Sequence, residues 1–152
     1  MKFLKAVRLD DSDARIYAVE GGAAQDGEWV VSGGYAMCAL AQGHRQSPCH
    51  CDSTFVAAGS HRRCTIAEVA EIDGPAYAAV RDGLVRHFLD DLGAPSAEAA
   101  RAVADEECAY TADLAAGFPA DVWITVRRES TDDGVAERYS VYQRLMIGAH
   151  KL

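Results

Sequence analysis

The chain has 152 residues, with 15 Lys and Arg against 23 Asp and Glu, and its formal net charge is -8. This length suits a single domain over residues 1–152 that buries a core of normal size. The negative charge opposes the phosphate contacts on which nucleic-acid binding depends, and it opposes binding to anionic membranes. Lysines interrupt the N-terminal apolar run, and no run is long enough to span a bilayer. We therefore expect a cytoplasmic protein of bacterial type, with reduced cysteines and without nucleic-acid or membrane partners.

Alternating apolar and polar residues predict four strands in the first half of the chain, at 3–10, 14–20, 27–37 and 64–72. Turn-forming residues separate the first three strands, which is typical of antiparallel pairing. Residues 38–63 show no sustained period. The fourth strand ends at Asp73-Gly74-Pro75, which interrupts the alternation.

Two helices are predicted back to back after this point. Asp73 can cap the first helix, Pro75 suits its first turn, and its apolar stripe runs to about residue 92. Ser96 opens a second helix, which we expect to end near Gly117. Strands at 122–130 and 135–146 then flank a hairpin signal at residues 131–134. The order of strands, two helices and strands predicts an α+β fold, with an antiparallel sheet of about five or six strands and both helices on one face.

Several segments together resemble a known family. They are the opening "MKFLKAVRLDDSD", the strand "GEWVVSGGYAM", "FVAAGS" leading into "TIAEVAEI", the helical "HFLDDLGAPSAEAARAVADEE" and the Arg-rich closing hairpin. In this order, over nearly the whole chain, they resemble a small proteobacterial family known as domain of unknown function 6505. The family has no established activity, so the resemblance carries over no site residues. Its members tend to be encoded near molybdenum-dependent formate dehydrogenase genes, so the resemblance implies an accessory or assembly role with a protein partner.

Residues 38–64 hold four of the five cysteines and three of the five histidines. Structural zinc sites take four Cys or His ligands, drawn from pairs that are close in sequence. The stretch offers two such pairs, and the predicted zinc ligands are Cys49, Cys51, His61 and Cys64. Four protein ligands leave no place for a reactive water, so the expected role of this zinc is structural.

Other interpretations of the same stretch stay open. Further donors are present, so the ligand set is not unique; they are Cys38, His44 and His50. In the absence of metal, Cys38 and Cys64 would be small buried side chains at strand ends, and residues 39–62 would form the least regular and most mobile part of the domain. A third interpretation is a redox pair of Cys49 and Cys51, although Cys-x-Cys lacks the helix-start setting of Cys-x-x-Cys oxidoreductases.

The second predicted helix places a carboxylate on its apolar face. The helical spacing predicts that this face is made by Val103, Glu107, Tyr110 and Leu114. The small residues Ala100, Ala104, Cys108 and Thr111 lie alongside it. An inward Glu107 would pair with a cation such as Arg127 or Arg144, lay its stem on the sheet with its head in water, or take a raised pKa and act as an acid or base.

No phosphate loop, nucleophile elbow or catalytic triad is recognisable in the sequence. We therefore expect a non-enzymatic accessory or interaction protein with a candidate Cys/His metal site. The alternative is a metal-dependent or thiol-dependent enzyme that uses the loop of residues 38–64, with Glu107 as its acid or base.

Overall fold

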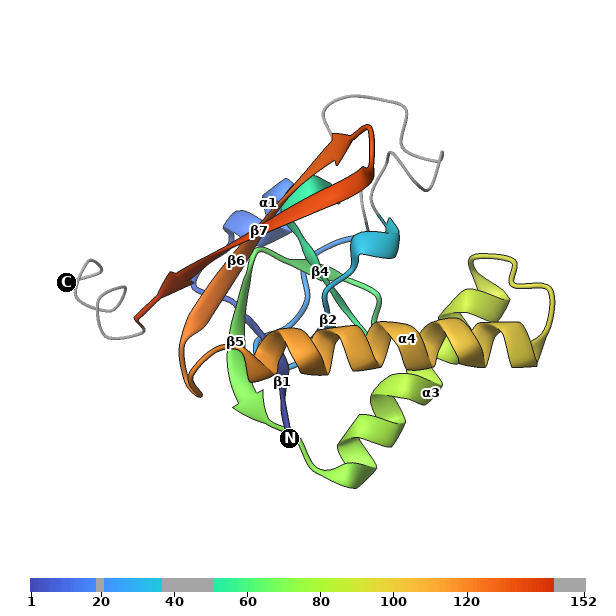
Figure 1. Cartoon of the computed structure of the whole chain (residues 1–152). Coiled ribbons are helices and arrows are strands. Elements are labelled where there is room, and N and C mark those ends of the chain that lie inside the picture. Colours follow the sequence, from blue (N-terminus) through green and yellow to red (C-terminus); the bar gives the residue numbers. More distant parts are fainter. Residues whose placement is uncertain (19–20, 37–50, 144–152) are drawn as a thin grey trace.

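The structure, a computed structural model, describes residues 1–18, 21–36 and 51–143. In chain order the elements are β1 (Lys2–Val7), α1 (Ser12–Ile16), β2 (Trp29–Val31), η1 (Gly34–Ala36), η2 (Cys51–Ser53), β3 (Phe55–Ala57), β4 (Arg63–Cys64), β5 (Ile66–Glu71), α3 (Gly74–Asp90), α4 (Ala97–Ala116), β6 (Trp123–Thr131) and β7 (Gly134–Tyr142). The strands form one antiparallel sheet in the order β4-β3-β2-β1-β5-β6-β7 (Figure 1). The predicted α+β class is confirmed, with seven strands in place of five or six.

The two long helices begin where the sequence predicts. The Asp73 side chain accepts a hydrogen bond of 2.8 Å from the amide of Ala76 at the start of α3. Ser96 caps α4 in the same way, with a bond of 3.0 Å from the amide of Ala99. These caps satisfy amides that a helix leaves without intrahelical partners, so the boundaries are set by local chemistry.

Both helices pack on one face of the sheet, as predicted (Figure 1). The core on this face is made by Phe3 and Val31 from the sheet, Val80, Leu84 and Phe88 from α3, and Ala100, Ala104 and Cys108 from α4. Their sequence neighbours Leu4 and Val30 belong to a second core cluster, because successive residues of a strand point to opposite faces. Strands β1 to β6 all contribute to that cluster, so the sheet curls around it.

The strand predicted over residues 14–20 is wrong at 14–16, which belong to the short helix α1, and residues 19–20 lie outside the described residues. The side chains of Asp13 and Tyr17 both bond to the hydroxyl of Thr65, at 2.9 Å and 2.8 Å. One helical turn places residues four apart next to each other, whereas a strand would hold them about 13 Å apart. This contact with Thr65 therefore explains why helical geometry replaces the apparent alternation.

Strand β3 lies in the part of the chain that was expected to be irregular, and β4 lies at the start of the strand predicted at 64–72. Phe55 pairs with Cys64 in register, and β3 also pairs with β2. Within the segment predicted to be the least regular, residues 55–57 form a strand, while residues 37–50 lie outside the described residues, so that prediction is not tested as a whole. Strands of two and three residues are too short to show a period, so only their pairing reveals them.

The buried face of α4 differs by one position from the predicted face. The buried side chains are small, namely Ala100, Ala104, Cys108, Thr111 and Ala115. Val103 and Tyr110 are 45% and 44% exposed. Small side chains let the helix backbone lie close to the sheet and to α3, and this close packing outweighs the burial of the larger residues.

Candidate functional site

A buried arginine, Arg128, joins three parts of the fold. Alternation along β6 points its side chain inward, and none of that side chain is exposed. Its Nη1 donates to the carbonyl oxygen of Thr54 at 2.7 Å, and its Nη2 donates to the carbonyl oxygen and, at 3.0 Å, to the Oγ of Ser32. A guanidinium taken out of water is costly unless such bonds replace its hydration. Arg128 therefore ties β6 to the ends of η2 and β2.

Glu137 is the counter-charge of Arg128, and it lies directly opposite in the β6–β7 register. Its Oε2 accepts from Arg128 Nε at 2.8 Å and from Tyr139 at 3.0 Å, while its Oε1 accepts from Tyr110 at 2.6 Å. Burial alone would raise the pKa of Glu137, but the hydrogen bonds from Tyr110 and Arg128 hold it below its ordinary value. The carboxylate is ionised and fully engaged, and it fixes the hairpin to α4.

Glu107 points inward from α4, as the sequence predicts, but its partner is a different one. Its Oε1 accepts from the backbone amide of Gly33 at 2.9 Å, and among the described residues Arg127 is not its partner. Arg144 lies outside those residues. Burial raises the pKa of Glu107, against the lowering effects of the Gly33 bond and of Arg128. Of the two carboxylates beside Arg128, Glu107 is the one that holds a proton more readily.

Thr111 completes this network on the helix side. Its Oγ1 accepts from the amide of Ser32 at 3.0 Å and donates to the carbonyl oxygen of Glu107 at 2.9 Å. Two carboxylates with opposite pKa shifts are the arrangement that acid-base catalysis requires, yet structural ion-pair networks produce the same shifts. The saturated bonding of Glu137 favours the structural role.

A second polar cluster joins the turn between β3 and β4 to the end of α3. His87 Nδ1 lies 2.8 Å from Asp91 Oδ2, and His61 Nδ1 lies 3.8 Å from the same oxygen. The imidazole rings of His61 and His87 stack with their centroids 3.9 Å apart. Burial lowers the pKa of His87, although the hydrogen bond with Asp91 raises it, and the same bond lowers the pKa of Asp91. The spacing of His87 and Asp91 could be recognised in the sequence, whereas their contact with His61 could not.

The predicted zinc ligands are described only in part. Cys49 lies outside the described residues, and Cys51 is the first residue of η2. His61 is in the turn beside His87, while Cys64 is buried in the core on β4. Burial raises the pKa of the Cys64 thiol well above its ordinary value, which opposes formation of the thiolate. The four-ligand set stays a prediction.

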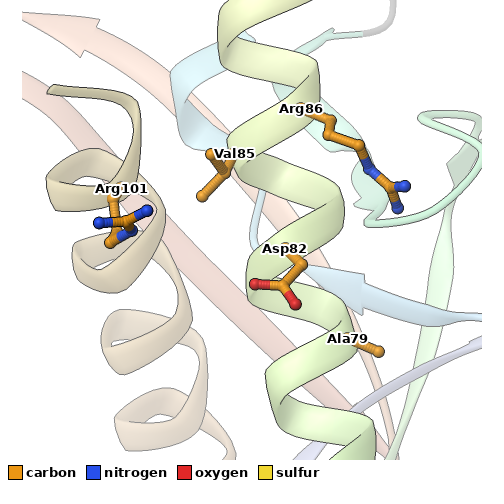
Figure 2. Close-up of a pocket in the computed structure, with 5 residues that line it drawn as sticks. All are labelled: Ala79, Asp82, Val85, Arg86 and Arg101. Carbon is orange, nitrogen blue, oxygen red and sulfur yellow. The ribbon is translucent and has the colours of Figure 1, made fainter. Parts of the chain in front are cut away.

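The surface between α3 and α4 carries an open depression of about 410 Å³. It is lined by Ala79, Asp82, Val85, Arg86 and Arg101. Figure 2 shows that the Arg86 side chain extends from α3 on the side away from α4, whereas Arg101 belongs to α4. The two guanidinium groups do not converge, so the depression lacks the set of convergent polar groups that a small-molecule site needs.

Comparisons with known proteins identify one family. The sequence model of a family of unknown function, DUF6505, matches residues 1–150. No curated protein and no solved structure matches the chain. Among the residues that the structure describes, no helix has the length and apolarity required to cross a bilayer.

Proposed function

We propose that this chain, which belongs to the DUF6505 family of unknown function, is a non-enzymatic accessory protein that binds an acidic, extended segment of a partner protein along its β6–β7 hairpin. The observation that carries the proposal is a pair of exposed arginines, Arg127 and Arg138, directly opposite each other in the hairpin. Like charges in directly opposed positions of neighbouring strands are destabilising. An acidic partner segment would remove this repulsion.

The arginine pair is positively charged, whereas the whole chain carries a net charge of -8. Arg127 has an acidic neighbour, Asp52, but the distance is 3.8 Å and the arginine side chain is 68% exposed. An exposed pair of this kind contributes little stability. Among the described residues no carboxylate forms an ion pair with Arg138. The position of Arg127 and Arg138 therefore offers local positive charge to an acidic segment, which the rest of the acidic chain would repel.

The edge of the sheet provides the backbone groups for such binding. β7 is the last strand in the sheet order, and within the described part of the chain it pairs with β6 alone. Its outer edge presents amides and carbonyls that an added strand can bond. Val141 and Tyr142, at the end of β7, are 45% and 43% exposed and supply apolar surface. An extended segment pairing with β7 would bring its acidic side chains next to Arg138.

The partner class follows from the family resemblance. Members of this family tend to be encoded near the genes of molybdenum-dependent formate dehydrogenases, so the proposed partner is this enzyme or one of its assembly factors.

A zinc ion held by Cys49, Cys51, His61 and Cys64 would have a structural role in such a protein, because it would tie the loop to β4. A chelator would then lower the melting temperature, and Cys51→Ser would abolish this effect.

Two measurements test the proposal. Binding of the purified protein to the formate dehydrogenase of the same organism is compared for the wild type, Arg138→Glu and Arg86→Glu. Both substitutions change the charge equally, but Arg86 lies on α3, away from the hairpin. We expect Arg138→Glu to weaken binding at least tenfold and Arg86→Glu to leave it unchanged. Equal binding by the two variants would reject the hairpin as the docking surface.

The second measurement tests the choice of partner. Deleting the gene in the organism that encodes it should lower formate dehydrogenase activity, and the wild-type gene should restore it where Arg138→Glu does not. Unchanged activity in the deletion strain, together with no binding by the wild-type protein, would exclude formate dehydrogenase as the partner.

A further inference from the structure

We propose that His61, His87 and Asp91 form a binding site for a divalent transition metal, with zinc as the best fit. Each residue offers one ligand atom, and the three atoms all lie within 4.8 Å of one another. The site joins the β3–β4 turn to the last turn of α3. It is distinct from the β6–β7 hairpin and does not depend on the proposed partner.

The distances between the ligand atoms suit a tetrahedral metal. Ligands about 2.0–2.1 Å from zinc lie about 3.4 Å from one another in a tetrahedron. The distance from Asp91 Oδ2 to His87 Nδ1 is 2.8 Å, and that to His61 Nδ1 is 3.8 Å, so the two values lie on either side of this spacing. The stacked rings must turn so that both lone pairs point at the ion. The ion would then replace the hydrogen bond between His87 Nδ1 and Asp91 Oδ2.

The types of ligand select the metal. Two imidazoles and one carboxylate suit zinc, cobalt, nickel or copper, whereas magnesium and calcium prefer sites made of oxygen atoms. Three protein ligands leave the fourth tetrahedral position open to water or to an external donor. The site therefore resembles catalytic or exchangeable zinc sites more than closed structural ones.

The backbone holds His61 in position before any metal arrives. His61 has a φ of 61°, in the left-handed region that few residues other than glycine adopt. Its amide donates to the carbonyl oxygen of Ala57 at 2.9 Å, which closes the turn. The second ring nitrogen of His61, Nε2, is also buried and has no hydrogen-bond partner among the described residues. Either ring nitrogen is therefore available as a ligand.

His61 is shared with the predicted thiolate set, so the experiment must separate the two. Metal binding is measured in the Cys49→Ser/Cys51→Ser variant, which cannot form the thiolate site. The metal-free protein is titrated with Zn²⁺ by calorimetry and with Co²⁺ by absorption spectroscopy. We expect one metal per chain and a tetrahedral Co²⁺ spectrum without the near-ultraviolet charge-transfer band of cobalt thiolates.

Substitutions then locate the site. Asp91→Asn should weaken Zn²⁺ binding at least tenfold, while Asp90→Asn makes the same change at the neighbouring exposed residue and should have no effect. His61→Asn is a second variant, because asparagine tolerates the left-handed conformation while removing the imidazole. Circular dichroism confirms that each variant is folded. Absence of Zn²⁺ binding in the double cysteine variant, or binding that is equal in Asp91→Asn and Asp90→Asn, would overturn the proposal.

Discussion

Replacing Arg128 by methionine removes a buried charge while keeping most of the side-chain volume. The variant loses the bonds to Glu137, Thr54 and Ser32, which come from three separate parts of the chain. Glu137 keeps its bonds from Tyr110 and Tyr139, and its side chain is 19% exposed, so water can reach it. The carbonyl groups of Thr54 and Ser32 belong to residues that are no more than 1% exposed. They are left without this donor.

The cost can be worked out from these contacts. A buried acceptor that loses its donor costs about 1–3 kcal/mol, and two such carbonyls are affected. Breaking a buried ion pair by removing one partner costs about 3–5 kcal/mol in other proteins. These are two estimates of the same loss, and both centre on about 4 kcal/mol. We therefore expect Arg128→Met to lower the free energy of unfolding by about 4 kcal/mol, a large share of the roughly 5–15 kcal/mol by which folded domains are stable. With a urea m-value of about 2 kcal/mol per M, the midpoint would fall by about 2 M.

Urea unfolding at pH 7, followed by far-ultraviolet circular dichroism, measures this change. Arg127→Met is the matched control, since Arg127 is the neighbouring residue on β6 and its side chain is 68% exposed. Its ion pair with Asp52, at 3.8 Å, should be worth no more than about 1 kcal/mol. If the two variants have the same midpoint, Arg128 does not hold the hairpin to the rest of the fold, and the structural role assigned to the network is wrong.

Three further predictions concern single side chains. Glu107→Gln should be more stable than wild type at pH 7, because the pKa of Glu107 is raised in the folded state. The contribution of Glu107 to stability is therefore present below about pH 4.3, the ordinary pKa of a glutamate, and is lost as the pH rises through its folded-state pKa. Glu137→Gln should be less stable than wild type at pH 7, because the pKa of Glu137 is lowered in the folded state. The difference in stability between the two proteins should shrink below about pH 4.3, since the contribution of Glu137 is lost as the pH falls through its folded-state pKa. Urea titrations between pH 3 and pH 8 check both signs. Gly83→Ala should destabilise α3 by about 1–3 kcal/mol, since the added Cβ would lie 2.6 Å from the carbonyl oxygen of Ala58. Gly74→Ala should not destabilise the protein in this way, because a Cβ at position 74 has no heavy atom within 4 Å. A similar melting temperature for the two alanine variants would contradict the close packing inferred for α3.

Elements with strong local signals were predictable from the sequence. Asp73 and Ser96 cap α3 and α4 through bonds to amides three residues away. Thr131 and Gly134 end the paired strands of the closing hairpin. Capping and turn formation involve neighbours in the chain, so the residues that decide them can be recognised without knowing the fold.

Short elements were decided by distant partners. The helix α1 exists where the alternation predicted a strand, and its residues Asp13 and Tyr17 bond to Thr65. β3 and β4 are too short for a hydrophobic period, and pairing with β2 and with each other makes them strands. In each case the local preference is weak, so the free energy of long-range contacts determines the conformation.

In the candidate sites, too, features of a single segment were predictable from the sequence, whereas contacts between segments were not. The sequence alone indicated that Glu107 faces inward and that His61 belongs to a cluster of metal-binding residue types. It could not show that Gly33 bonds Glu107, that Arg128 is buried or that His87 stacks on His61. Helical spacing located the inward side of α4 to within one position, because it is a property of one segment. The identity of the residue that meets that side depends on how separate segments pack, and only the tertiary structure contains this information.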